Sequence, residues 1–159
     1  MVSRQAGKRP LWLTLLGLAC LVGFGISAYL ALVVSPPDVN QGELIRIMYA
    51  HVSVAWICFA AITISAVFAM LYLWRGRPQD DVRALANAEA ALVFSFLTVT
   101  GGMIYSKPTL NTWWTWDAKL TLTALMVALI VGYFLVRALI DDPQRRGRVS
   151  AVVMIVVLV

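Results

Sequence analysis

Charged side chains are scarce in this 159-residue chain. Asp, Glu, Lys and Arg together make up 13% of the residues, about half the share found in soluble domains, whereas 61% are hydrophobic. The apolar residues stand in long unbroken blocks and not in the periodic stripes of a soluble helical core. Together these features exclude an ordinary water-soluble domain and indicate a membrane protein.

Residues with catalytic or redox chemistry are also few. There is one histidine, and the two cysteines, Cys20 and Cys58, each lie inside an apolar block. We interpret both as small buried apolar side chains and not as a redox pair. The sequence has no Gly-rich phosphate loop, no Ser/His/Asp set, no H-E-x-x-H and no C-x-x-C-H motif. We therefore expect neither hydrolysis nor nucleotide binding.

Four apolar segments are long enough to cross a bilayer, whose core of about 30 Å requires roughly 20 helical residues. They cover residues 11–34, 47–74, 84–105 and 118–140, and a shorter apolar run covers residues 149–159. Because lipid offers no hydrogen-bond partners to an open backbone, each segment is predicted to be a helix. We predict an all-α polytopic bundle, a single integral membrane domain over residues 1–159, with four complete transmembrane helices and part of a fifth.

Basic residues predict the orientation of these segments in the membrane. Ten lie before the first segment or in the loops after the second and fourth: Arg4, Lys8, Arg9, Arg75, Arg77, Arg83, Arg137, Arg145, Arg146 and Arg148. Three lie on the other side: Arg46, Lys107 and Lys119. The net charge of +5 therefore indicates orientation and not nucleic-acid binding, and it places the N-terminus in the cytoplasm. The aspartates in the same loops are interpreted as solvated charges: Asp80, Asp81, Asp141 and Asp142.

The stretch TLNTWWTWDAKLT, residues 109–121, places three tryptophans within four positions: Trp113, Trp114 and Trp116. Tryptophans commonly form belts at membrane interfaces, but three in four loop residues exceed what a belt needs. Their flat faces and indole N–H groups suit a large planar ligand with polar edges, such as a porphyrin. Asp117 follows where the fourth segment begins, in the position of a helix N-cap.

His51 is the sole histidine and lies about one turn into the second segment, near the outer surface. A titratable group is costly inside a membrane helix and is more often functional there, and neutral imidazole is a common ligand of metals, including haem iron. A structural hydrogen bond is the alternative role. Lys107, Lys119 and Arg46 share the outer face and are candidates to bind haem propionates. Their alternative role is ordinary snorkelling to the interface.

Two stretches resemble a known family. WWTWDAKLT, residues 113–121, resembles the WWD signature of haem-handling proteins. RIMYAHVSVAW, residues 46–56, resembles the histidine-bearing second helix of the cytochrome c maturation protein C (CcmC) family of haem exporters and haem-delivery proteins. The resemblance covers nearly the whole chain. It implies a fold of six membrane helices, with the WWD loop, here about residues 106–121, between the third and fourth.

The same resemblance implies a site and a function. His51 corresponds to one axial ligand of a haem b iron, and four loop residues match the WWD motif: Trp113, Trp114, Trp116 and Asp117. The implied function is not enzymatic: haem is presented at the outer face of the cytoplasmic (inner) membrane for a haem chaperone during c-type cytochrome biogenesis. The implied partners are that chaperone, CcmE, the small membrane subunit CcmD, and the ABC transporter subunits CcmA and CcmB.

Two features depart from the family pattern. Leu110 and Asn111 stand where the family motif usually has tryptophan and glycine. The family's second axial histidine lies between its fifth and sixth helices, and this chain has no second histidine. We therefore expect the chain to be a fragment of the six-helix fold that carries half of the iron ligation.

Two other functions stay open at this stage. One is a membrane b-type cytochrome that oxidises quinol, which would require paired histidines within helices. The other is a scaffold subunit without haem, whose tryptophans only anchor it in lipid or contact a partner.

Overall fold

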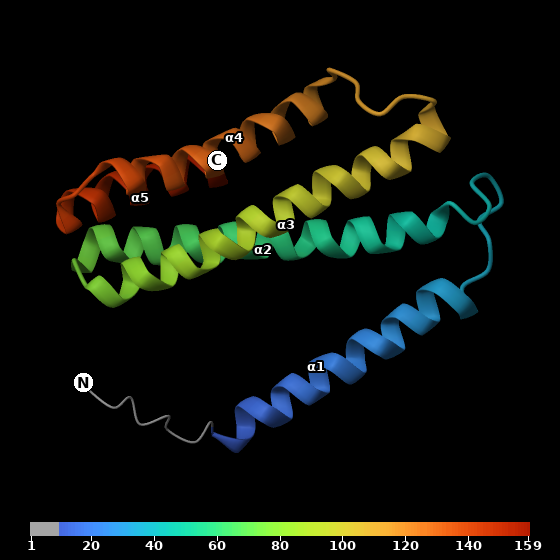
Figure 1. The fold of residues 1–159 in the computed structure, drawn as a ribbon, viewed down its shortest axis with the longest axis horizontal. Coiled ribbons are helices and arrows are strands. Elements are labelled where there is room, and N and C mark those ends of the chain that lie inside the picture. Colours follow the sequence, from blue (N-terminus) through green and yellow to red (C-terminus); the bar gives the residue numbers. More distant parts are fainter. Residues whose placement is uncertain (1–9) are drawn as a thin grey trace, which may run out of the picture. The chain divides into compact units, whose positions relative to one another are not determined.

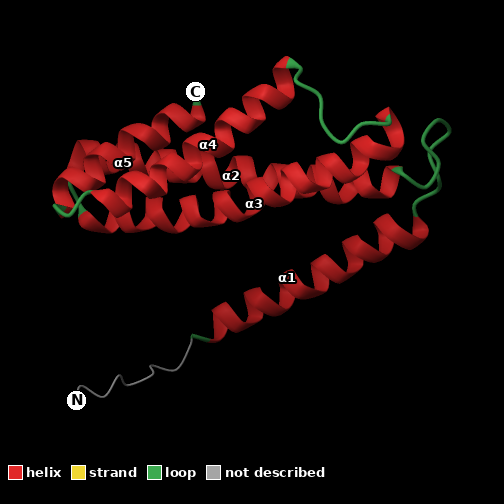
Figure 2. Ribbon diagram, turned by 45° about the horizontal axis from the view of Figure 1, so that its top comes forward, coloured by secondary structure: helices red, strands yellow, loops and turns green. Residues whose placement is uncertain are grey.

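The computed structural model describes residues 10–159, and this part of the chain consists of helices and loops without a strand (Figure 2). The helices are α1 (Leu11–Tyr29), the π-helical turn η1 (Leu30–Val34), α2 (Ile45–Arg75), α3 (Pro78–Leu110), α4 (Ala118–Leu139) and α5 (Pro143–Leu158). Four stretches are long and apolar enough to cross a membrane: Leu11–Val34, Ile45–Arg75, Pro78–Leu110 and Ala118–Leu139. The predicted all-α fold with four membrane-spanning helices is confirmed.

The third helix extends well beyond the apolar block from which it was predicted. Its first turn holds Pro78, whose missing N–H costs nothing there, and Asp80 and Asp81, whose charges suit the helix N-terminus. Its last turn contains Pro108, and the helix ends at Leu110. Only residues 111–117 remain between α3 and α4, so the connecting loop is shorter than the expected 106–121.

The chain divides into two compact units, Met1–Arg46 and Ile47–Val159. In the described part of the first unit, α1 continues into η1 and is followed by a tight loop. Asp38 and Gly42 exchange two backbone hydrogen bonds of 3.0 and 2.8 Å in this loop, and Gly42 has a positive φ of 57°. Cys20, which was interpreted as buried, is exposed on α1. An apolar thiol suits a surface that faces lipid.

In the second unit, α2 and α3 run antiparallel beside each other, and so do α4 and α5 (Figure 1). The buried core is rich in alanine from α2 and α3: Ala61, Ala66, Ala69, Ala84, Ala88 and Ala91. Such small side chains allow two helix backbones to approach closely. The Ser65 hydroxyl accordingly donates a 2.7 Å hydrogen bond to the backbone carbonyl of Ala84.

The aspartates that begin α3 are not solvated loop charges. Asp80 is buried, at 4% exposure. Arg137 on α4 donates two hydrogen bonds to the carboxylate of Asp81, of 2.7 and 2.9 Å, in a partly buried ion pair. The longer α3 brings Asp81 within reach of α4, which is why the interpretation as solvated charge is wrong for these two residues.

Candidate functional site

His51 lies in the second turn of α2 and packs against α3. A Cβ atom placed on Gly102 would lie 3.2 Å from His51 Cε1, and one placed on Gly101 would lie 3.4 Å from His51 Nδ1. The two adjacent glycines therefore leave the space that the imidazole occupies. Sequence reasoning did not single out this pair, although two consecutive glycines inside an apolar helix indicate a close approach by a neighbour.

The two ring nitrogens of His51 have different surroundings. Nδ1 is buried and makes no well-formed hydrogen bond, although the backbone of Thr98 faces the imidazole. Nε2 is therefore the nitrogen that is left to meet a ligand. In metal-bound histidines the second nitrogen usually donates to a carbonyl or carboxylate, and Thr98 offers a backbone carbonyl on the appropriate side.

The loop 111–117 begins at a residue in the left-handed backbone conformation. Asn111 ends α3 with φ of 56°, and Lys107 Nζ donates to its backbone and side-chain oxygens at 3.3 and 3.5 Å. Asparagine is the residue, after glycine, that best tolerates this conformation. The departure from the family's usual glycine at this position thus leaves the turn intact. Lys107 caps the end of the helix and is not an isolated surface charge.

The three tryptophans of the loop differ in exposure. Trp114 is partly buried, and its indole Nε1 is buried without a hydrogen-bond partner. It packs edge to face against Trp116, with ring centroids 5.7 Å apart and planes at 74°. Trp113 and Trp116 are 53% and 77% exposed. Two indoles therefore have exposed faces, and Trp114 packs against one of them, Trp116.

Asp117 caps the first turn of α4, as predicted. Its Oδ1 accepts a 2.9 Å hydrogen bond from the Leu120 N–H, and its Oδ2 accepts a 2.7 Å hydrogen bond from the Thr115 hydroxyl. The hydrogen bond from the Leu120 N–H, and to a smaller extent the one from Thr115, lower the pKa of Asp117 below the usual aspartate range. The carboxylate stays charged at neutral pH and joins the tryptophan loop to the start of α4.

The histidine and the tryptophan loop lie at the same end of the second unit. Lys119, in the first turn of α4, is close enough to His51 to interact with it electrostatically. Figure 1 shows the loop before α4 at the end of the unit where α2 begins and α3 ends. A cation, an imidazole and exposed indoles are thus gathered at one end.

Arg46, the third candidate cation, belongs to the first unit. Its Nε lies 2.9 Å from Glu43 Oε2, and its Nη2 donates to the Ser35 carbonyl at 3.5 Å. Within residues 10–159 no three His, Cys, Asp or Glu side chains are grouped as a metal site.

The sequence was compared with known proteins. The model of the family described as "Heme exporter protein C" matches residues 3–159. The chain is 32% identical over 123 residues to the heme exporter protein C of Bradyrhizobium diazoefficiens, an alignment that covers 77% of this chain and 46% of the relative. It is 30% identical over 142 residues to that of Haemophilus influenzae, covering 87% and 56%. It is 30% identical over 122 residues to that of Escherichia coli K12, covering 77% and 50%.

The chain spans about half the length of the curated relatives it matches. The family model nevertheless matches nearly all of it, including α2 with His51 and the loop with the tryptophans. The helices that can span a membrane agree with a multi-pass membrane protein. The chain belongs to the heme exporter protein C (CcmC) family.

Proposed function

We propose that this chain holds haem b at the outer face of the cytoplasmic membrane and presents it for delivery to the chaperone CcmE during c-type cytochrome biogenesis. The observation that supports this most strongly is the setting of His51. Its imidazole lies against Gly101 and Gly102, has Nδ1 buried, and shares its end of the unit with the tryptophan loop.

The donor set suits haem. A haem iron needs an axial nitrogen, for which His51 Nε2 is available, and the porphyrin needs flat apolar contacts, for which Trp113 and Trp116 have exposed faces. Trp114 would support Trp116 through the edge-to-face contact. Asp117 would fix the loop to α4 through its cap and would not touch the iron.

Cations would bind the haem propionates. Lys119 is best placed for this, because it lies near His51 and makes no ion pair in the described chain. Lys107 and Arg46 remain candidates, but each would first have to leave a present partner: Asn111 for Lys107 and Glu43 for Arg46. The roles of all three are part of the proposal.

The proposed mechanism consists of holding and releasing haem, without an enzymatic step. The indoles would exclude water from the ring edge, and binding of CcmE would shift the haem from His51 to the chaperone. CcmD and the transporter subunits CcmA and CcmB would be the other partners. The ten basic residues that the sequence places before the first apolar segment and after the second and fourth segments support an orientation with the tryptophan loop outside. No observation favours a quinol-oxidising cytochrome, since the sequence contains one histidine.

Replacing His51 tests the proposal. In the full-length protein His51→Ala is expected to reduce the haem absorption band of the purified protein strongly, because an axial nitrogen is lost. Ser53→Ala is the matched control: Ser53 is exposed on the same helix and donates only to the Tyr49 carbonyl. An unchanged spectrum and unchanged cytochrome c yield in His51→Ala would contradict the proposal.

A further inference from the structure

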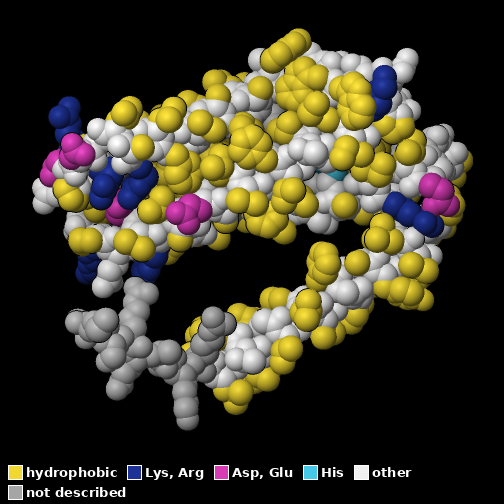
Figure 3. Space-filling model, viewed as in Figure 1, with side chains coloured by type: hydrophobic (Ala, Val, Ile, Leu, Met, Phe, Trp, Pro, Cys, Tyr) yellow, Lys and Arg dark blue, Asp and Glu magenta, His cyan; other side chains and the backbone are white. Residues whose placement is uncertain are grey.

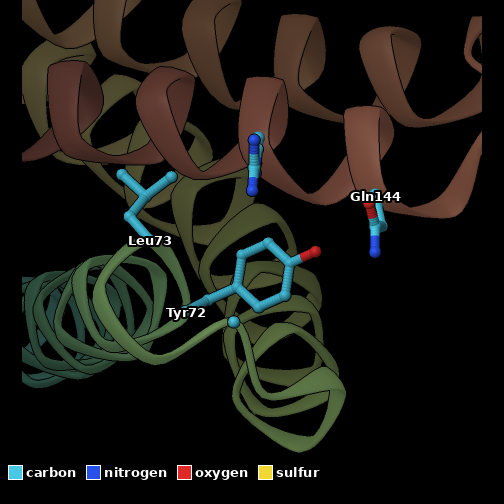
Figure 4. A pocket seen from close by; sticks show the side chains of 5 residues that line it. Tyr72, Leu73 and Gln144 are labelled. Atoms are coloured by element: carbon cyan, nitrogen blue, oxygen red, sulfur yellow. The ribbon is translucent and has the colours of Figure 1, made fainter.

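A small pocket lies in the second unit at the end away from the tryptophan loop. It has a volume of about 60 Å³ and is lined by Tyr72, Leu73, Gly76, Gln144 and Arg148. Figure 4 shows the Tyr72 ring projecting from α2, with its hydroxyl directed toward α5, the helix that carries Gln144. Sites for drug-sized ligands have roughly 300–1,000 Å³, so this pocket suits one small chemical group and excludes a nucleotide or a porphyrin.

Three of the five residues that line this pocket carry side-chain donors of hydrogen bonds. Arg148 contributes a guanidinium, Gln144 an amide and Tyr72 a hydroxyl, and no carboxylate is among the lining residues. Gln144 and Arg148 are four residues apart on α5 and thus share one face of the helix. Arg148 makes no ion pair within the described chain, so its charge is not compensated there. These features favour an anion, and a guanidinium with neutral donors suits a phosphate group.

The charge around the pocket favours the same ligand. Seven arginines and four aspartates lie at this end of the unit: Arg75, Arg77, Arg83, Arg137, Arg145, Arg146, Arg148, Asp80, Asp81, Asp141 and Asp142. Three of the aspartates are already engaged: Asp80 by Arg83, Asp81 by Arg137, and Asp142 as the cap of α5. Figure 3 shows charged side chains gathered here, with apolar side chains along the flanks.

The position of the pocket identifies the source of the phosphate. The pocket lies where α2 ends and α5 begins. Because α2 is longer than the roughly 20 residues that cross a hydrocarbon core, we infer that its end reaches the level of the lipid headgroups. Leu73 gives it an apolar side next to the polar donors. Basic pockets between membrane helices bind anionic lipid headgroups in this way. We propose that the pocket binds a phosphate group, supplied by the headgroup of an anionic phospholipid.

The test is a lipid titration of the full-length protein in neutral detergent. Dioleoylphosphatidylglycerol is expected to raise the melting temperature, and dioleoylglycerol, which has the same acyl chains and no phosphate, is not. Arg148→Gln should weaken the apparent affinity for the phospholipid about tenfold, because it removes the charged hydrogen bonds that a guanidinium lining the pocket makes directly to a phosphate. Arg145→Gln removes the same charge from the same helix outside the pocket and should keep the wild-type affinity.

A second variant and a second ligand distinguish the possible outcomes of this titration. Gln144→Leu should also weaken lipid binding, which covers the case in which Arg148→Gln does not fold. Stabilisation by inorganic phosphate at the same affinity would support the phosphate site but overturn its assignment to lipid. Equal losses in Arg145→Gln and Arg148→Gln, or equal effects of the two lipids, would overturn the site. The haem spectrum is not involved, so this result is independent of the proposed function.

Discussion

At the scale of single residues, the imidazole of His51 fits against α3 because its neighbours Gly101 and Gly102 have no side chains. The sequence made His51 stand out because it is the only histidine, and it made the loop tryptophans stand out because three of them fall within four positions. It did not reveal that Gly101 and Gly102 make room for the imidazole, because glycines in an apolar helix have several possible roles. It also did not reveal that Lys107 caps α3, since that contact depends on the backbone conformation at Asn111.

Gly102→Ala tests the importance of this space. The added Cβ would lie 3.2 Å from His51 Cε1, so the imidazole has to shift by a few tenths of an ångström. Disturbing a group that orients a metal ligand commonly costs 10–100-fold in affinity, and we expect a loss of about tenfold in haem affinity, measured by absorbance titration. Gly132→Ala on α4 is the control, because its Cβ would meet nothing within 4 Å. Equal haem affinities of the two variants would show that the glycines do not position His51.

At the scale of helices, the apolar blocks predicted the existence and order of the spans but not their ends. The blocks mark only the residues that face hydrocarbon, whereas α3 continues through polar residues at both of its ends. Pro78 and the aspartates that follow it are good helix-starting residues, and this local chemistry could have been used. Contacts between helices were less predictable. The ion pair of Asp81 with Arg137 is an example, because the two residues are far apart in the chain and either side chain could have faced water.

The contact between α2 and α5 gives a prediction at this scale. A Cβ on Gly147 would lie 2.7 Å from Tyr72 Cε1 and Oη, and both residues are buried. Gly147→Ala should therefore destabilise the protein by about 1–3 kcal/mol, the usual cost of overfilling a packed site. Thermal unfolding in detergent measures this, with Gly132→Ala as the control for the change in helix propensity. Combining Gly147→Ala with Tyr72→Leu should restore part of the loss; no destabilisation in Gly147→Ala would mean that the contact is looser than described.

At the scale of the whole molecule, two ends of the second unit differ in chemistry. One end gathers His51, the exposed indoles and Lys119, and the other gathers arginines around the small pocket. The count of basic residues predicted this asymmetry without any structure, because it depends only on where charges fall between apolar blocks. The position of the loop at the end of the unit where α2 begins also followed in outline, since two antiparallel helices return the chain to the same end.

The central claim is that the histidine and the tryptophan loop share the outer side of the membrane. The most direct measurement is labelling of intact cells with a membrane-impermeant maleimide, in a protein whose Cys20 and Cys58 are replaced by serine. Single cysteines replace Val39, which is 98% exposed shortly before α2, Thr115 in the tryptophan loop, and Arg77 between α2 and α3. We predict labelling at positions 39 and 115 in intact cells, and labelling at 77 only after permeabilisation. Labelling of positions 39 and 115 from opposite sides of the membrane would contradict the account.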